Sequence, residues 1–244
     1  MTLLDRRLLL TALTACLLSI GAACSSGKLL GGQDTTPNTL SRAERDAGWE
    51  LLFNGKTLDA WRGFRRDSPP SGWAVIDGTI TLSERAGDLI TKAQFRDFEL
   101  RLQWMIASGG NSGIFFRVTE EHGGVYETGP EIQVLDNLLH PDGKNPLTSA
   151  GSNFGLNAPS EDTVLPVGSW NEVILRVQGN RVQHWLNGTL IVDYELLSPE
   201  WEEQVASSKF AQWPNYGRAR EGHIALQDHG DPVRYRDIKI LRLH

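Results

Sequence analysis

Strict alternation of apolar and polar residues is the feature of this sequence that most limits its fold. Across Phe98–Ile106 the apolar residues fall on every second position, with Glu99, Arg101 and Gln103 between them. A period of two belongs to a β-strand with one buried face, whereas an amphipathic helix would place apolar residues three and four apart. The segment is therefore predicted to be a strand that lies on a hydrophobic core.

Shorter segments of the same kind follow along the chain, separated by turn residues. Asn187-Gly188 is the strongest turn signal, because both residues tolerate the positive φ of a two-residue hairpin. With 25 Gly and 11 Pro, the composition favours many short strands over a helix bundle. The chain is therefore predicted to be all-β, a two-sheet antiparallel sandwich. Its predicted strands are 98–106, 112–118, 131–135, 171–177, 181–186, 189–194, 223–227 and 233–243.

One short helix is predicted near residues 199–208. Ser198 is a favourable N-cap, and Pro199 and Glu200 suit the first turn of a helix. The surrounding segment 195–222 is rich in aromatic residues. It is interpreted as an insertion that packs near the mouth of a substrate-binding site.

The N-terminal residues 1–23 have the order of an export signal: Arg6 and Arg7, an apolar stretch, then small residues. Gly21-Ala-Ala-Cys24 resembles a bacterial lipobox, which implies that Cys24 is lipidated and anchors the chain in the cell envelope, facing the periplasm or in the outer membrane. Cys16 fits the same box, but the apolar stretch continues beyond it, so Cys24 is preferred. A plain cleaved signal is the other alternative.

The remaining chain divides into a tether, 24–46, rich in Gly, Ser and Thr, and one domain, 47–244. Both cysteines precede the domain, which therefore contains no disulfide, thiolate zinc site or cysteine nucleophile. Lys and Arg total 24 against 30 Asp and Glu, with no basic run, so nucleic acid is a poor candidate partner. Membrane contact is expected through the lipid anchor only.

The densest group of polar residues surrounds the predicted strand 131–135. Glu131 and Gln133 share one face of it, and Asp136 follows its end. Paired carboxylates are the usual acid and base of sugar-cleaving enzymes, although a solvated outer face would give the same pattern. In the predicted strand 112–118, alternation puts Ile114, Phe116 and Val118 on the face opposite Phe115 and Arg117. Arg117 ends an otherwise apolar run and could bind an oxyanion or be an ordinary surface charge. Trp185, on the face opposite Val182, is the tryptophan best placed to contact a sugar.

A second group follows the strand 223–227. Gln227 and His229 alternate onto one face, and histidine is a natural general base near neutral pH. Asp228 and Asp231 lie close by, which leaves a divalent metal as an alternative, but their spacing matches no metal-binding signature. No organic cofactor is indicated. His184, by contrast, shares a face with apolar residues and is predicted to be buried in the core.

Six motifs in one order resemble the 3-keto-disaccharide hydrolase family, over about residues 47–243. They are Gly48–Trp61, Asn111–Arg117, Tyr126–Asn137, Gly168–Asn171, His184–Gly188 and Ile224–Asp231. The resemblance implies a concanavalin A-like jelly roll and an oxidised carbohydrate substrate, a glycoside with a ketone at C3. It also implies Glu131 or His229 as the base, with Arg117 and Gln133 at the keto oxygen. Asp136 and Gln227 would orient these groups.

A ketone at C3 gives such a substrate a particular route to cleavage. The ketone acidifies the proton on C2, a base removes it, and the enolate expels the group on C1; water then adds back. A non-catalytic carbohydrate-binding module on the same sandwich is the alternative, because a fold does not fix a function. A conventional glycosidase is a third reading, but Gln133 puts an amide where the central acid would stand.

Overall fold

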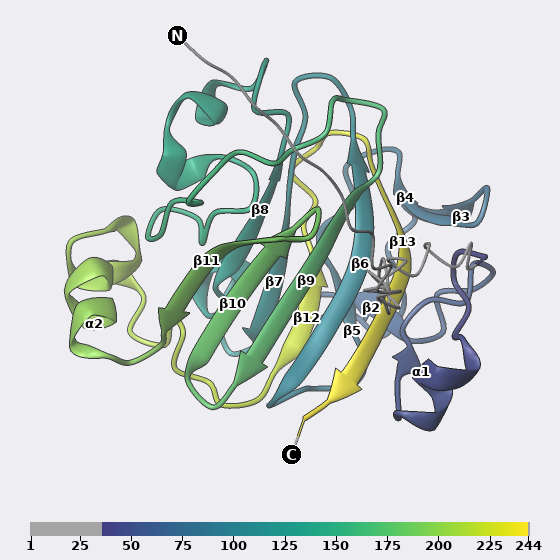
Figure 1. Ribbon diagram of the computed structural model, residues 1–244, viewed down its shortest axis with the longest axis horizontal. Helices are drawn as coiled ribbons and strands as arrows, with labels where there is room; N and C mark the ends of the chain where they lie inside the picture. The colour runs from purple at the N-terminus through teal and green to yellow at the C-terminus, as the bar shows by residue number, and fades with distance from the viewer. Residues whose placement is uncertain (1–35, 244) are drawn as a thin grey trace, which may run out of the picture. The chain divides into compact units, whose positions relative to one another are not determined.

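The computed structural model describes residues 36–243. The predicted export signal and Cys24 lie outside the described residues. Within the described part of the chain, two antiparallel sheets face each other, which confirms the predicted all-β sandwich (Figure 1).

The larger sheet has the strand order β11-β10-β9-β6-β13-β4-β3, and β1 pairs with β13. Its strands are β1 (Glu50–Leu51), β3 (Trp73–Ile76), β4 (Thr79–Leu82), β6 (Phe98–Ile106), β9 (Asn171–Gln178), β10 (Arg181–Leu186), β11 (Thr189–Glu195) and β13 (Val233–Arg242). The smaller sheet has the order β2-β5-β12-β7-β8. Its strands are β2 (Trp61–Gly63), β5 (Leu89–Thr91), β7 (Asn111–Val118), β8 (Glu131–Leu135) and β12 (His223–Leu226).

The core lies between the two sheets. Along β6 every second residue is buried, as the alternation predicts, and Phe98 and Leu100 are fully buried. They belong to one apolar cluster with Ile114 of β7 and Ile132 of β8. The opposite face of the smaller sheet is thereby free for polar groups.

The strand β7 departs from simple alternation at Arg117. Arg117 has φ 53°, and the pairing of β7 with β12 shifts register there. The bulge turns Val118 to the side of Phe115, so the expectation that Val118 faces away from Phe115 is wrong. Both join a small apolar cluster on the outer face of the smaller sheet.

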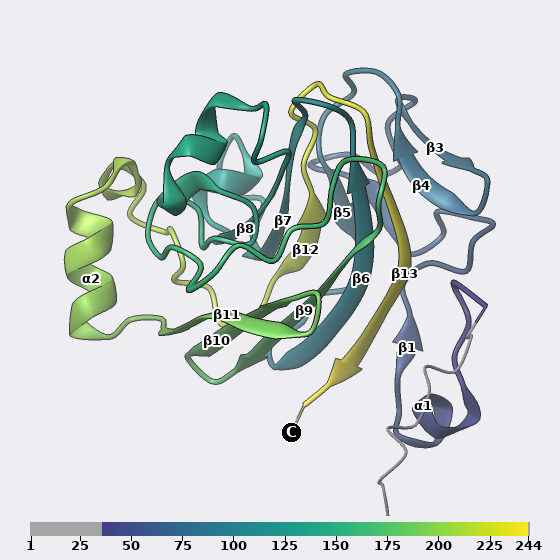
Figure 2. The same ribbon diagram turned by 45° about the horizontal axis from the view of Figure 1, so that its top comes forward.

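The predicted helix is present as α2 (Pro199–Ala206), with the Ser198 hydroxyl accepting the backbone N–H of Trp201 at 3.1 Å. A 3₁₀ helix, η4 (Lys209–Gln212), follows it. The helix α2 lies to one side of the sandwich, next to the edge strand β11 (Figure 2). Stacked rings hold this insertion: Trp201 lies 5.8 Å from Tyr216, which lies 4.0 Å from Phe210.

The residues directly before the domain are packed against it. A short helix, α1 (Arg42–Asp46), begins at a capping box formed by Ser41 and Glu44. The Glu44 carboxylate lies 2.7 Å from Lys239 Nζ on β13, and the Asn38 side-chain amide donates to the Gly78 carbonyl at 2.9 Å. Residues 38–46, expected as part of the tether, thus make specific contacts with the sandwich. No described helix is long and apolar enough to cross a bilayer.

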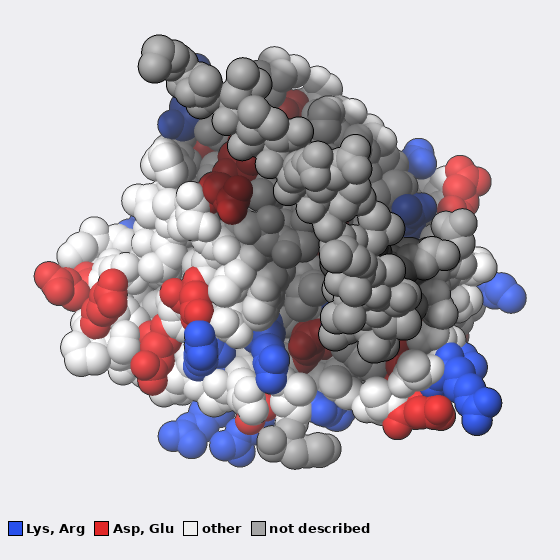
Figure 3. Space-filling model, in the orientation of Figure 1, with Lys and Arg blue, Asp and Glu red and all other residues white. Residues whose placement is uncertain are grey.

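Charges on the face shown in Figure 3 are of both signs. The visible Lys and Arg side chains lie along its lower and right margins and at its upper left, with Asp and Glu among them. This mixture differs from the continuous basic surface that nucleic-acid binding uses.

Candidate functional site

The candidate site is centred on Gly113, on the outer face of the smaller sheet. Gly113 is the register partner of Gln133 on β8. On the other side, the backbone N–H of Gln227 donates to the Gly113 carbonyl at 2.9 Å. Neighbouring strands lie about 4.8 Å apart, so the side chains of Gln133 and Gln227 flank a position that has no side chain of its own.

The Glu131 side chain fills the space that Gly113 leaves. A Cβ built on Gly113 would lie 2.1 Å from Oε1 of Glu131. The glutamate carboxyl therefore leans over the glycine, between the two glutamines. Glu131, Gln133 and Gln227, which the family resemblance implies for one site, thus lie next to one another on the same face of the smaller sheet.

The polar atoms around Gly113 lack partners among the described residues. Gln133 Nε2 and Gln227 Oε1 are buried without a hydrogen bond there. The Glu131 side chain is 7% exposed. Buried polar groups are nearly always hydrogen-bonded, so two unpartnered amide atoms beside a buried carboxyl are unusual for a purely structural arrangement.

Burial changes the proton affinity of Glu131. Desolvation of the carboxylate, with smaller contributions from the charges of Asp88 and Asp142, raises the pKa of Glu131 to about 8, although Lys209 opposes the rise. A buried carboxyl whose pKa lies far above the usual range is characteristic of an acid–base group.

Asp88 is a second carboxyl of the site and was not predicted from the sequence. It directly precedes β5, where Leu89 pairs with Leu226, so Asp88 extends the row next to Gln227. Desolvation, with the charge of Asp228, raises the pKa of Asp88 to about 6, against a lowering hydrogen bond from the Asp228 backbone N–H at 2.9 Å. Because it stands before a strand of only three residues, no alternation marked its face.

Lys209 supplies the positive charge near Glu131. It comes from η4 in the aromatic insertion, and its Nζ lies 4.2 Å from the ring centre of Phe154. Desolvation lowers the pKa of Lys209, while the charges of Glu131 and Asp142 act against that lowering. The sequence signal was weak: Lys209 is the sole lysine between residues 195 and 222.

Two histidines meet beside the segment that follows β8. The ring centres of His229 and His140 lie 6.4 Å apart, nearly perpendicular. His229 Nδ1 is 3.9 Å from an Asp231 carboxylate oxygen, and its side chain is half exposed. His140 Nδ1 accepts the backbone N–H of Asp142 at 3.2 Å. Nothing in the sequence indicated that His140 lies beside His229, because the two residues are far apart in the chain and the path of the loop that carries His140 could not be predicted.

The structure does not bring Arg117 and Trp185 to Glu131. The Arg117 guanidinium donates to the backbone carbonyl of Gly179 at 2.7 Å and to that of Arg96 at 3.2 Å, so it bridges the two sheets. Its side chain is 4% exposed. Trp185 belongs to β10 of the larger sheet, on the face opposite the buried His184.

Asp136 shapes the loop that carries His140. One carboxylate oxygen accepts the backbone N–H of Gly109 at 2.7 Å, and the other accepts those of Leu138 and Leu139 at 3.0 and 3.4 Å. Asp136 thus fixes backbone in place. Within residues 36–243, no three His, Cys, Asp or Glu side chains are grouped closely enough to hold a metal ion.

Comparison with known proteins gives concordant matches. Residues 48–241 match the family described as the 3-keto-alpha-glucoside-1,2-lyase-like domain. The chain is 32% identical to a 3-keto-disaccharide hydrolase of Bacteroides thetaiotaomicron, over 93% of this chain and 96% of that protein. A crystal structure of a putative glycosyl hydrolase from Parabacteroides distasonis superposes with a TM-score of 0.81 at 31% identity, covering 86% of this chain and all of that one. A second from the same species gives 0.62 at 26% identity, covering 80% and 99%.

Proposed function

The chain belongs to the 3-keto-alpha-glucoside-1,2-lyase-like family, and from this premise we propose that it cleaves glycosides whose sugar carries a ketone at C3. The observation that carries the proposal is the Glu131 carboxyl, buried over Gly113 with its pKa raised to about 8. A carbohydrate-binding module needs hydrogen bonds to hydroxyls but has no use for such a proton-transfer group.

Glu131 is proposed as the base at C2. A proton next to a ketone is a weak acid, so a carboxylate whose basicity is raised by burial is a better base than an ordinary glutamate. Removal of the C2 proton forms an enolate, and its electron pair then expels the C1 oxygen with the aglycone. Conjugate addition of water to the resulting enone restores the 3-keto sugar, so the net reaction is hydrolysis.

Lys209 and the two glutamines are proposed to hold the oxygen at C3. The enolate places negative charge on that oxygen, and a preorganised cation and amide donor stabilise such charge most in a desolvated site. Gln133 Nε2 is an unused donor beside Glu131. Lys209 takes the role that the family resemblance implied for Arg117, whose guanidinium is already bonded to backbone carbonyls.

His229 is proposed as the acid that protonates the leaving oxygen. It is half exposed, where an aglycone would leave, and its ring contacts that of His140. A leaving group that is already a weak base needs no such proton. The role of His229 can therefore be tested by comparing a weakly basic with a strongly basic leaving group.

The test compares 3-keto-glucosides that carry 4-nitrophenyl or methyl aglycones, beside their unoxidised parents. Glu131→Gln should lose about 10²- to 10⁴-fold in turnover on both keto substrates. His229→Ala should lose a comparable factor on the methyl glycoside only, and in D₂O it should exchange the C2 hydrogen faster than it releases methanol. Circular dichroism checks that both variants fold.

Three results would count against the proposal. Equal cleavage of the unoxidised parents indicates a conventional glycosidase. Release from neither form, with binding of plain glucosides, indicates a binding module. Full turnover by Glu131→Gln on the keto substrates removes Glu131 from the mechanism.

The site of action is proposed to be the cell envelope, with Cys24 as the lipid-bearing residue. The support is the order of charged, apolar and small residues before it. Labelling with a radioactive fatty acid should mark the wild-type chain and not Cys24→Ser. Equal labelling of Cys24→Ser would move the anchor to Cys16.

A further inference from the structure

The proposed reaction needs a second base when water adds back to the enone. The water oxygen bonds to C1, and C2 takes back the proton that Glu131 holds after the elimination. The water must also lose a proton, and Glu131 cannot accept it while it is still protonated. The chain therefore needs another proton acceptor near C1.

Asp88 lies on the same face of the smaller sheet as Glu131. The next residue, Leu89, is buried in the core between the sheets, so alternation puts Asp88 on the outer face. Asp88 neighbours Gln227, which in turn neighbours Gly113. Two strand spacings, about 10 Å, leave room for a sugar ring and a water between the two carboxyls. The charge of Asp88 nevertheless reaches Glu131 and raises its pKa.

Asp88 is more accessible to water than Glu131. The Glu131 side chain is 7% exposed, whereas Asp88 is only partly buried. Its Oδ1 accepts the backbone N–H of Asp228 at 2.9 Å, and its Oδ2 has no hydrogen-bond partner among residues 36–243. Its pKa of about 6 makes it a stronger base than an ordinary aspartate, yet leaves it ionised at neutral pH.

Asp228 holds Asp88 beside the segment that carries His229. One Asp228 carboxylate oxygen accepts the backbone N–H of Gly87 at 2.6 Å, and the other accepts that of Gly230 at 2.8 Å. The two loops are thus joined through one side chain. Because His229 is the proposed acid at the C1 oxygen, Asp88 lies on the side where the aglycone leaves and water enters.

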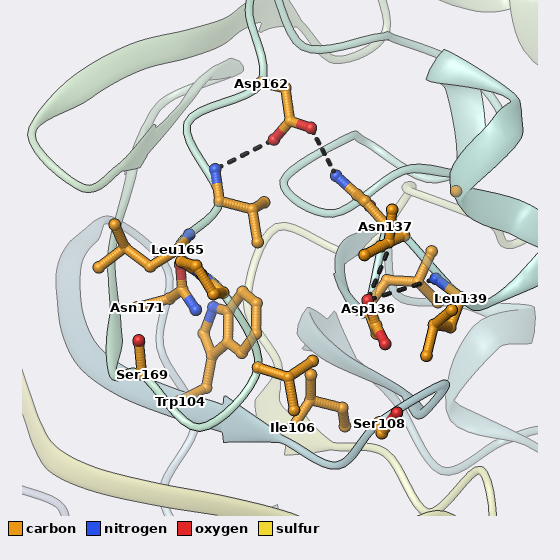
Figure 4. Close-up of a pocket in the computed structure, with 16 residues that line it drawn as sticks. Trp104, Ile106, Ser108, Asp136, Asn137, Leu139, Asp162, Leu165, Ser169 and Asn171 are labelled. Carbon is orange, nitrogen blue, oxygen red and sulfur yellow. Dashed lines mark hydrogen bonds between the residues drawn. The ribbon is translucent and has the colours of Figure 1, made fainter.

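The carboxylates in the cavity at the end of β6 offer no comparable base (Figure 4). The two oxygens of Asp162 accept the Val164 N–H and the Asn137 amide, at 3.0 and 3.3 Å. Both oxygens of Asp136 also accept backbone N–H groups. These carboxylates are engaged within the protein, whereas Asp88 keeps one oxygen free.

We propose that Asp88 is the general base for the water that adds at C1. The water oxygen forms its bond to C1, and the water proton goes to Asp88. The resulting enolate takes the proton of Glu131 at C2, and Asp88 then releases its proton to solvent. The proposal rests on the proposed function, because the enone is the product of the elimination.

The test supplies the enone, a 1,2-unsaturated 3-keto sugar, directly and follows the loss of its ultraviolet absorbance. Asp88→Asn keeps an acceptor for the Asp228 N–H but removes the base, so hydration should fall about 10²- to 10⁴-fold. Release of 4-nitrophenol from the keto-glucoside in a single turnover should stay near the wild-type rate. Asp77→Asn, in the exposed turn between β3 and β4, is the matched control and should hydrate the enone normally.

Azide distinguishes the loss of a base from a displaced loop. It is an anion with no proton to lose, so its addition to C1 needs no base. Asp88→Asn should therefore form the 3-keto-glycosyl azide, while the wild-type carboxylate repels the anion and forms less. A variant whose loop has moved away would not be rescued, and thermal melts show whether it is folded.

Three results overturn the proposal: hydration of the enone by Asp88→Asn at the wild-type rate, a loss that azide does not restore, and a wild type that does not hydrate the enone. Each leaves the proposed cleavage of keto-glycosides standing, because that is judged by aglycone release. A wild type that releases no 4-nitrophenol overturns the proposed function instead, and the free enone still tests Asp88.

Discussion

At the scale of single residues, a substitution at Gly113 is expected to lower activity while leaving stability nearly unchanged. In Gly113→Ala the new Cβ meets the end of the Glu131 side chain, which can swing away at little cost to the fold. Turnover should fall at least about 10²-fold, as for a displaced general base, while the melting temperature changes little.

Gly123→Ala is the matched control, because its Cβ would also meet a glutamate side-chain oxygen, that of Glu127, at 3.1 Å. Both melting temperatures and both turnover rates are measured. A Gly113→Ala enzyme as active as Gly123→Ala would mean that the position of the Glu131 carboxyl is unimportant.

Lys209 makes a prediction about pH dependence. Its charge lowers the pKa of Glu131, so Lys209→Met should raise that pKa further. The rise of kcat/KM with pH, set by ionisation of the base, should then move to higher pH, whereas Lys209→Arg should keep it near the wild-type position. A pH–rate profile of the three proteins measures this shift. Superimposable profiles would mean that the charge of Lys209 does not affect the ionisation of Glu131.

Part of this site could be predicted from the sequence, and the limit is physical. Glu131 and Gln133 share a strand face by simple alternation, and Gln227 follows a second strand. Asp88 and Lys209 reach the site through cross-strand register and a docked insertion, which no local pattern encodes. Arg117 was placed by alternation on a strand that bulges at that residue, so its side chain turns to bridge the sheets.

At the scale of secondary-structure elements, the insertion that carries Lys209 depends on its stacked rings. Phe210→Ala removes a ring that is 2% exposed and lies 4.0 Å from Tyr216. The expected loss of unfolding free energy is about 3–5 kcal/mol, measured by urea denaturation. If η4 loosens, the pH–rate profile should shift as in Lys209→Met; an unshifted profile would show that the position of η4 does not depend on Phe210.

Long strands could be predicted from the sequence more accurately than short ones. Long alternating strands such as β6 were found with their observed bounds, and the cap at Ser198 marked α2. The strands β1 to β5 contain only two to four residues each, too few for alternation to show. The helix α1 was missed because its neighbours have the composition of a linker, although Ser41 and Glu44 form a capping box.

At the scale of the whole molecule, the buried Glu131 makes stability depend on pH. The pKa of Glu131 is about 8 in the folded chain, above its usual 4.5, so the folded state holds the proton more tightly. This stabilisation is complete below about pH 4.5 and is lost as pH rises through about 8. Between pH 5 and 9 the wild type should lose a few kcal/mol relative to Glu131→Gln.

Denaturant unfolding at several pH values measures this difference. The Glu131→Gln curve should keep a smaller decline from Asp88, whose pKa of about 6 is also raised. Parallel curves for the two proteins would mean that Glu131 titrates normally when the chain is folded.

The position of β13 has a consequence for the order in which the chain is made. This strand ends the described chain, yet it lies between β6 and β4 inside the larger sheet and also pairs with β1. Until it leaves the ribosome, the facing edges of β6 and β4 have no partner between them, and unpaired edges invite association with other chains. Cotranslational folding of this sheet therefore stops short of completion until β13 has been made.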